Sequence, residues 1–257
     1  MPRHVEAWID GVALSSVGPF LIQQVYEDAP ALEITEGERP GRSGQLLITR
    51  KRQTLKVAME LVIAERFDLM LRTHYMEVLA GWAQGSTLEL SSHPGRRLNV
   101  ACTGEPALNE ARNYASGIRI EWTAYEVPYW EDKTATELTL SGDDEEDDLM
   151  IPGTVPAPVS LTVTVSSASS AALTDFSVTV GGSTVVLDEL EIAATGVITF
   201  GRDARDNLMI RSGTTGLLSK RTAESADDLI AGPGITTVSF TGDVACDVVF
   251  SVRGRWA

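Results

Sequence analysis

Apolar and polar residues alternate along most of the chain, which is the period of strands that bury one face. The clearest run covers residues 117–125, where one side is apolar and the other polar. The apolar side holds Ile118, Ile120 and Trp122, and the polar side holds Arg119, Glu121 and Thr123. Pro128 cannot donate a ladder hydrogen bond and restricts the residue before it, so this strand is predicted to end near Val127.

Earlier in the chain the same alternation predicts several short strands. Asp10-Gly11 is a strong hairpin-turn dipeptide between an alternating start and residues 12–14. Further strands are predicted at 20–26, 32–34, 46–48 and 55–63, and a glycine-rich loop at 37–44. We interpret 46–48 and 55–63 as one hairpin with a basic tip at Arg50, Lys51 and Arg52.

The period changes over residues 65–82, where apolar residues recur at steps of three and four. This predicts an amphipathic helix with Gly85 as a plausible stop. Its stripe consists of Phe67, Met70, Leu71, His74, Val78 and Trp82. Two more strands are predicted at 87–90 and 98–102. One helix on an antiparallel sheet gives a compact α+β unit of roughly 130 residues.

The second half alternates throughout, and no helix-length periodic stretch competes. Apolar residues fall at every second position in 161–165, 176–180, 238–240 and 246–252, with turn signals such as Gly181-Gly182 between them. Several short strands separated in this way are typical of an antiparallel sandwich of about 100 residues.

Between the halves lies an acidic stretch, Asp143 to Asp148, followed by a segment rich in proline and glycine. We therefore expect three parts: an N-terminal domain at 1–133, a linker at 134–157 and a C-terminal sandwich at 158–257. Adjacent like charges have little reason to be buried, so the linker is predicted to be extended, solvated and disordered. A calcium site is the alternative, but the run lacks the alternating ligands and central glycine of an EF-hand loop.

Charge and composition exclude several classes of function. Residues 1–133 carry 14 Lys and Arg against 18 Asp and Glu, and residues 134–257 carry 7 against 18. Because nucleic-acid binding needs basic surface, sequence-specific DNA or RNA binding is disfavoured. No apolar run is long enough for a membrane span, and the start lacks the apolar core of a signal peptide. Cys102 and Cys246 fall in different predicted domains and are interpreted as small core residues, not a disulfide.

Catalytic chemistry has little support in the residues. The histidines are His4, His74 and His93, and His74 lies on the predicted apolar stripe, where a packed histidine is expected. Zinc-ligand spacings, nucleophile elbows and phosphate-binding loops are all missing from the sequence. We therefore expect no catalytic residues, no metal site, no cofactor and no enzymatic activity.

Protein contacts and sugar contacts are the two binding roles that stay open. Arg50, Lys51 and Arg52, with Arg96 and Arg97, are either solvated tips or contacts in an interface, where arginine is enriched. Trp130 is the aromatic candidate for such a contact. A sugar platform in the second half is less favoured because that half has no tyrosine and several phenylalanines fall on the apolar phase. Phe200 and Trp256 remain its candidate exposed rings.

The order of these elements resembles the distal tail protein family of siphophages, the hub of the tail tip. The resemblance is carried by the basic-tipped hairpin, the helix at 65–82, the segment from Trp122 to Trp130, residues 161–165 and 225–240, and the ending Val252-Arg-Gly-Arg-Trp256. It implies a mainly β protein with an N-terminal α+β ring-forming domain (antiparallel sheets plus one helix) and a C-terminal galectin-like β-sandwich.

The resemblance also implies a function. It implies a virion structural protein of a long non-contractile tail, assembled in the host cytoplasm. A homo-hexameric ring would join the tail tube to the tail-tip, baseplate and host-binding components. DNA would pass through the ring without specific binding, and no part would insert into a membrane. The alternative is a carbohydrate- or receptor-binding module of the tail tip.

Overall fold

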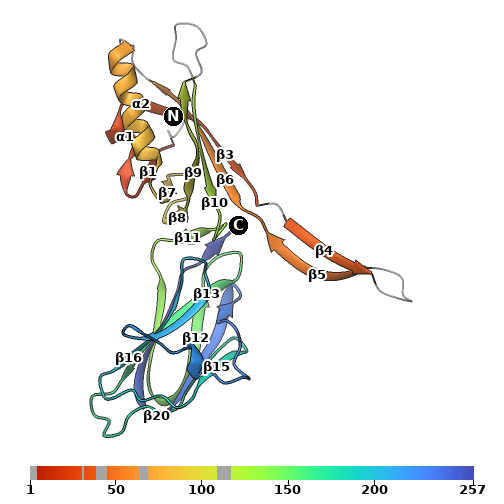
Figure 1. Ribbon diagram of the computed structural model, residues 1–257, viewed down its shortest axis with the longest axis vertical. Helices are drawn as coiled ribbons and strands as arrows, with labels where there is room; N and C mark the ends of the chain where they lie inside the picture. The colour runs from red at the N-terminus through yellow and green to blue at the C-terminus, as the bar shows by residue number, and fades with distance from the viewer. Residues whose placement is uncertain (1–4, 31, 39–44, 64–68, 109–116) are drawn as a thin grey trace. The chain divides into compact units, whose positions relative to one another are not determined.

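The computed structural model describes residues 5–30, 32–38, 45–63, 69–108 and 117–257. By its internal contacts the chain divides into two compact units, an N-terminal unit ending at Trp130 and a C-terminal unit spanning Glu131–Trp256. Antiparallel strands dominate both units, which confirms the prediction of a mainly β protein (Figure 1).

The N-terminal unit contains two described helices and strands in three groups. A four-stranded sheet has the order β3-β6-β10-β9, while β2, β1, β7 and β8 lie side by side in a second group, and β4 pairs with β5. The elements are β1 Ala7–Ile9, β2 Val12–Ala13, α1 Leu14–Val17, β3 Phe20–Asp28, β4 Leu32–Glu38, β5 Gln45–Arg52, β6 Leu55–Ile63, α2 Leu69–Ala83, β7 Thr87–Leu90, β8 Arg96–Asn99, β9 Ala101–Leu108, β10 Ile118–Ala124 and β11 Trp130–Asp132.

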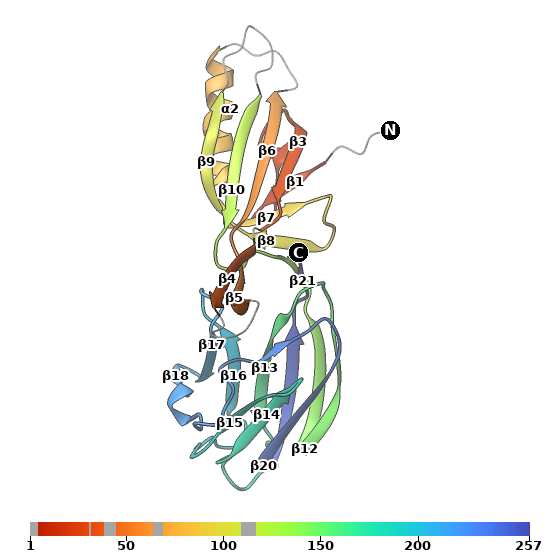
Figure 2. The same ribbon diagram turned by 90° about the vertical axis from the view of Figure 1, so that its right-hand side faces the viewer.

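The strand with the clearest alternation forms as predicted and carries the centre of this unit. In β10, Ile118, Ile120 and Trp122 are fully buried. The Trp122 indole donates a hydrogen bond to the carbonyl of Ala83 at 2.9 Å and meets the Trp82 ring edge-on, with centroids 6.1 Å apart. These contacts fasten α2 to the sheet, and Figure 2 shows α2 running beside β9 and β10.

The helix lies where it was predicted, but only part of the predicted stripe is buried. Trp82 of that stripe is buried, together with Leu79 and Ala83, whereas Leu71 and Val78 are 45% and 37% exposed and His74 is also exposed. Both faces of this helix carry apolar residues, so a period of 3.6 alone cannot choose between two neighbouring phases. Phe67, the first residue of the predicted stripe, lies outside the described residues.

The predicted hairpin of 46–48 with 55–63 is wrong. β5 pairs with β4, and β6 pairs instead with β3 and β10. Arg50, Lys51 and Arg52 therefore lie at the end of β5, opposite residues 32–34 of β4. Alternation predicts a strand but not its partner, because pairing depends on contacts that are distant in sequence. Of the glycine-rich loop, Gly37 belongs to β4 and residues 39–44 lie outside the described residues.

The predicted Asp10-Gly11 hairpin is confirmed. Both residues have positive φ, 47° and 79°, as a two-residue turn of the primed type requires, and Ile9 pairs directly with Val12. The Asp10 carboxylate also accepts hydrogen bonds from the backbone N–H groups of Ser86 and Thr87. This contact joins the turn to the end of α2 and the start of β7.

In the C-terminal unit every described strand from β12 to β20 belongs to one connected set. The path runs β15-β14-β20-β13-β16-β17-β18, with β12 beside β20 and β19 beside β13. The elements are β12 Thr136–Ile151, β13 Ala157–Val165, β14 Phe176–Val180, β15 Ser183–Leu187, β16 Val197–Arg202, β17 Leu208–Ser212, β18 Thr215–Gly216, η1 Leu218–Lys220, β19 Ile230–Ala231, β20 Gly234–Val252 and β21 Arg255–Trp256.

The longest strand, β20, organises this unit. It takes in both of the late predicted strands, 238–240 and 246–252. Its first half pairs with β14 and its second half with β13, while β12 follows it along the other side. The interior is apolar and continuous, and Phe176, Phe200, Phe240 and Phe250 each expose 1% or less of their surface. Phe200 is therefore a core residue, and its proposal as an exposed ring is wrong.

The acidic stretch is a strand, so its interpretation as a disordered linker is wrong. Asp144 to Asp148 pair in register with residues 237–241 of β20, and the ladder shifts register between Gly142 and Asp144. Thr241 and Thr237 donate side-chain hydrogen bonds to Asp144 and Asp148 at 3.1 and 3.0 Å. All six acids are exposed. β12 has β20 on one side and no other described strand on the other, and along residues 143–148 both faces of the strand reach solvent, so the carboxylates stay in water without leaving the ladder.

Both cysteines lie within described strands, and neither forms a disulfide. Cys246 is buried in the core, where burial raises the pKa of its thiol to about 11. Cys102 is half-buried in β9. Within the described residues, no helix combines the length and apolar character that a membrane span requires.

Candidate functional site

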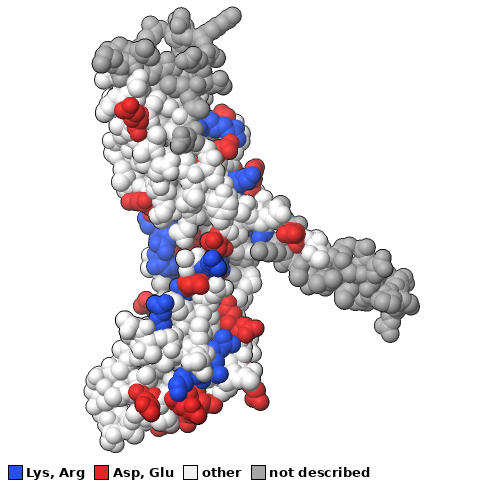
Figure 3. Space-filling view, viewed as in Figure 1, with Lys and Arg blue, Asp and Glu red and all other residues white. Residues whose placement is uncertain are grey.

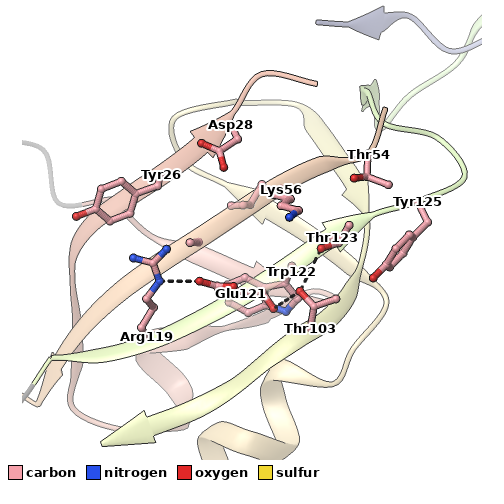
Figure 4. Close-up of a pocket in the computed structure, with 12 residues that line it drawn as sticks. Tyr26, Asp28, Thr54, Lys56, Thr103, Arg119, Glu121, Trp122, Thr123 and Tyr125 are labelled. Atoms are coloured by element: carbon pink, nitrogen blue, oxygen red, sulfur yellow. Dashed lines mark hydrogen bonds and ion pairs between the residues drawn. The ribbon is translucent and has the colours of Figure 1, made fainter. Parts of the chain in front are cut away.

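The open face of the four-stranded sheet carries a polar hollow. Because side chains alternate along a strand, the residues between the buried positions of β10 point away from α2. Together with neighbours on β3, β6 and β9 they surround a hollow of about 520 Å³ (Figure 4). Its lining residues are Tyr26, Asp28, Thr54, Lys56, Val57, Ala58, Thr103, Arg119, Glu121, Trp122, Thr123 and Tyr125.

Arg119 is the most connected charged residue of the hollow. Its Nε donates to Glu121 at 2.8 Å, an Nη lies 3.6 Å from Glu60, and its guanidinium is 5.4 Å from the centre of the Tyr26 ring. The hydrogen bond to Glu121 raises the pKa of Arg119 above its ordinary value, so the side chain is charged at any physiological pH. These contacts fix the direction of the guanidinium on an otherwise exposed surface.

Hydroxyl groups line the opposite side of the hollow. The hydroxyls of Thr103 on β9 and Thr123 on β10 are 3.1 Å apart, and the Thr103 hydroxyl lies 3.4 Å from the carbonyl of Glu121. Tyr26 and Tyr125 lie at opposite ends in Figure 4, and Tyr125 is 57% exposed. The arrangement offers donors, acceptors and two rings, and within the described residues no group of three metal-binding side chains gathers anywhere.

The predicted interaction residues lie elsewhere in the N-terminal unit. Arg52, at the end of β5, holds its guanidinium 5.7 Å from the centre of the Tyr129 ring. Arg50 and Lys51 precede it in β5, and the structure describes their backbone only. Arg96 and Arg97 begin β8 and are both half-buried. Arg52, Arg96 and Arg97 do not line the hollow.

Trp130 is buried, with 4% of its surface exposed. Its ring stacks on His93 with centroids 4.5 Å apart, and His93 Nε2 lies 2.9 Å from both carboxylate oxygens of Glu27. His93 thus packs between Trp130 and Glu27. Because the Trp130 ring is buried, it offers little surface for contact with another protein. Trp256 is also engaged, since its indole donates to Asp132 at 2.9 Å.

Sequence reasoning did not identify the hollow. The one available signal was that all five tyrosines of the chain fall in the first half. Tyr26 and Tyr125 are separated by about a hundred residues, and only the pairing of β3 with β6 and of β6 with β10 brings their strands into one sheet.

On the face drawn in Figure 3, acidic and basic side chains are interspersed across both units. A surface that binds nucleic acid by counterion release needs clustered Lys and Arg. On this face the described residues form no such cluster.

Comparison with known proteins gives similarity in structure only. No protein-family model matches the chain, and no curated protein matches it. The crystal structure of the SPP1 Dit protein, a hub of the adsorption apparatus in phages that infect Gram-positive bacteria, is similar with a TM-score of 0.69 at 13% identity, over 97% of this chain and 98% of that one. The phage P2 baseplate in its activated conformation with Ca has a TM-score of 0.46 at 10% identity, over 99% and 98%.

The similarity to the SPP1 protein extends through both units, because nearly the whole of each chain is covered. At 13% identity it establishes the fold and leaves function to be argued separately. The chain has the fold of the phage distal tail protein, the hub family that the order of its sequence elements resembles.

Proposed function

We propose that this protein is a structural hub of a long non-contractile phage tail and that it has no enzymatic activity. The observation that carries the proposal is the similarity to the SPP1 Dit hub over 97% of this chain and 98% of that one. A shared fold alone does not fix function, but a match through both units at nearly equal length favours the same role over an unrelated one. The protein would be assembled in the host cytoplasm and become part of the virion at the tail tip.

The proposed assembly is a homo-hexameric ring formed through residues 1–133. A closed ring uses a heterologous interface, in which two different patches of one subunit meet on successive copies. The four-stranded sheet supports this because its two edges differ: β3 lies at one edge and β9 at the other. The β4–β5 ribbon adds a further surface, as its strands pair with each other and with no other described strand (Figure 1).

The partners proposed for the ring are the tail-tube protein on one side and tail-tip or host-binding proteins on the other. Exposed apolar side chains are available in both units, including Leu21 and Ile34 in the N-terminal unit and Ile230 and Ile235 in the C-terminal unit. A stable contact between neighbours in the ring needs roughly 1,600 Å² of buried surface. DNA would pass through without specific binding, in agreement with the acidic balance of the chain.

The test is the mass and image of the purified full-length chain, alone and with the tail-tube protein of the same phage. Light scattering should give six copies, and negative-stain images should show six-fold rings. Replacing exposed Leu21 and Ile34 by lysine should abolish the rings without unfolding the chain. The matched control replaces Val197 and Ile230 of the C-terminal unit, which are similarly exposed, by lysine.

If the rings survive the double variant Leu21→Lys, Ile34→Lys but disappear in the control pair, the ring interface lies in the C-terminal unit, and the proposal that residues 1–133 form it is wrong. A full-length chain that stays monomeric even with the tail-tube protein would count against a ring-forming hub altogether.

A further inference from the structure

Two tyrosines stand at the ends of the hollow on the open face of the four-stranded sheet. Tyr26 comes from β3 and is 36% exposed, and Tyr125 follows β10 and is 57% exposed (Figure 4). Exposed aromatic rings are unusual on a polar sheet face, because a ring gains free energy by burial. The Arg119 guanidinium already lies 5.4 Å from the centre of the Tyr26 ring, so the more exposed Tyr125 is the ring most available to a ligand that enters the hollow.

The polar groups between the rings are already held in position. Arg119 is fixed by Glu121 at 2.8 Å, and the hydroxyls of Thr103 and Thr123 are 3.1 Å apart. Groups held in this way need little reordering when a ligand arrives, which lowers the entropic cost of binding. They present donors and acceptors side by side on one surface, which suits a ligand that has both on every unit.

The charges of the hollow are balanced. Its lining contains two basic residues, Lys56 and Arg119, and two acidic residues, Asp28 and Glu121, and Glu60 pairs with Arg119 from outside. A site for phosphate or another strong anion would need an excess of Arg or Lys. The balance therefore disfavours charged ligands and favours a neutral one.

We propose that this hollow binds a neutral oligosaccharide. An apolar face of a sugar ring would stack on Tyr125, and the sugar hydroxyls would bond with Arg119, Glu121 and the threonine hydroxyls. A volume of about 520 Å³ lies within the range of small-molecule sites and accommodates a short saccharide. The site lies within one unit of one chain and does not depend on the ring proposed above.

The test uses the full-length chain on an array of neutral, acidic and phosphorylated glycans, followed by calorimetric titration of the best ligand. The expected result is retention of one or more neutral glycans with a dissociation constant of about 1 mM or tighter. Inorganic phosphate and glycerol phosphate, titrated in parallel, should give no saturable binding.

Variants locate the site. Tyr125→Ala should weaken binding roughly two- to tenfold, the loss expected for one stacked ring, and Tyr125→Phe should retain it. Glu121→Gln should weaken binding as well, because it releases Arg119. Tyr129→Ala, which removes a tyrosine that does not line the hollow, is the matched control and should bind as the parent chain does. Thermal melting of each variant confirms that it is folded.

Three results would overturn the proposal. The first is an array on which no neutral glycan is retained, and the second is a preference for phosphorylated or acidic glycans. The third is neutral-glycan binding that Tyr125→Ala leaves unchanged, which would place the sugar at another surface.

Discussion

In the N-terminal unit the edge strand β3 (Phe20–Asp28) is charged only at its last two residues, Glu27 and Asp28, whereas in the C-terminal unit the edge strand β12 carries six consecutive acids. Open strand edges expose unpaired N–H and C=O groups and are sites where another chain can add a strand. The ladder of β3 with β6 has a register shift between Ile22 and Gln24, and β9, at the other edge, contains Pro106 and has two register shifts against β10. The unit proposed to assemble thus keeps edges of low charge.

The acidic run of β12 has the opposite effect. A strand of 16 residues with one open side would be a strong template for uncontrolled pairing. Like charges on any second copy would face Asp143 to Asp148 directly and be repelled. The difference between the two edges indicates that charge restricts association of the C-terminal unit while the N-terminal unit remains able to associate.

The units also differ in how their cores are held. In the N-terminal unit a few polar contacts from large side chains fasten the helix to the strands, with the Trp122 indole bonded to Ala83 and the Trp82 indole bonded to Val12, both at 2.9 Å. In the C-terminal unit the interior is one continuous apolar cluster. Loss of one tryptophan is therefore expected to affect the N-terminal unit as a whole.

The largest expected effect is that of Trp122→Ala. It removes a fully buried ring and a buried hydrogen bond, and such truncations cost about 3–5 kcal/mol. Calorimetry and tryptophan emission should show the transition of the N-terminal unit at a lower temperature and that of the C-terminal unit unchanged. Four of the five tryptophans lie in residues 1–130, so emission reports mainly on that unit.

The matched variant is Phe240→Ala, which removes a ring of similar burial from the core of the C-terminal unit. It should lower the unfolding temperature of the C-terminal unit only. If either variant lowers the unfolding temperatures of both units equally, the two units do not unfold separately. The expectation that each core stabilises only its own unit would then be contradicted.

The next effect is on association. Neutralising Asp143 to Asp148 with Asn and Gln leaves the β12 ladder intact but removes the repulsion at its edge. We expect concentration-dependent self-association at neutral pH, measured by light scattering, with little change in melting temperature. High salt should produce a weaker form of the same result in the parent chain, because it screens exposed charges.

The control for this variant changes net charge by the same amount away from β12. It neutralises six exposed acids elsewhere in the C-terminal unit, namely Asp175, Asp188, Glu189, Glu191, Glu224 and Asp227. Equal self-association in both variants would mean that net charge matters and its placement on the edge does not.

The sequence predicts local features of the structure well, but it does not predict contacts between residues that are far apart in the chain. The Asp10-Gly11 turn, the strand around Trp122 and the position of α2 follow from neighbouring residues, and the structure confirms them. The pairing of β5 with β4 and the phase of α2 do not, because each was decided by packing against residues far along the chain.

The prediction of a disordered linker at Asp143 to Asp148 was wrong for a different physical reason. Six adjacent acids are typical of disordered segments, since they cannot be buried together. An edge strand removes that conflict, as its backbone is paired on one side while its side chains stay in water. The hollow could not be predicted either, because Tyr26 and Tyr125 meet the same cavity only through the order of β3, β6 and β10.

The smallest expected effect concerns one aspartate in each unit. Burial raises the pKa of Asp10, but hydrogen bonds from Ser86 and Thr87 outweigh it and hold the pKa below its ordinary value of 3.8. Asp243 follows the same logic, with burial outweighed by hydrogen bonds from Thr174, whose hydroxyl is 2.6 Å away. Because both pKa values are lower in the folded state, each carboxylate stabilises its unit above pH 3.8, and this contribution is lost as the pH falls through the folded pKa.

Asp10→Asn should therefore destabilise the N-terminal unit by about 1 kcal/mol at pH 7, less than a buried charged hydrogen bond contributes, because Asp10 is exposed and water screens its charge. Asparagine tolerates the positive φ of 47°, so the turn itself persists. Denaturant titrations at pH 7 and pH 3 should show the difference between variant and parent shrinking at the lower pH for the N-terminal unit alone. Asp243→Asn should give the same pattern for the C-terminal unit, and a difference independent of pH would exclude the charge of either carboxylate as the cause.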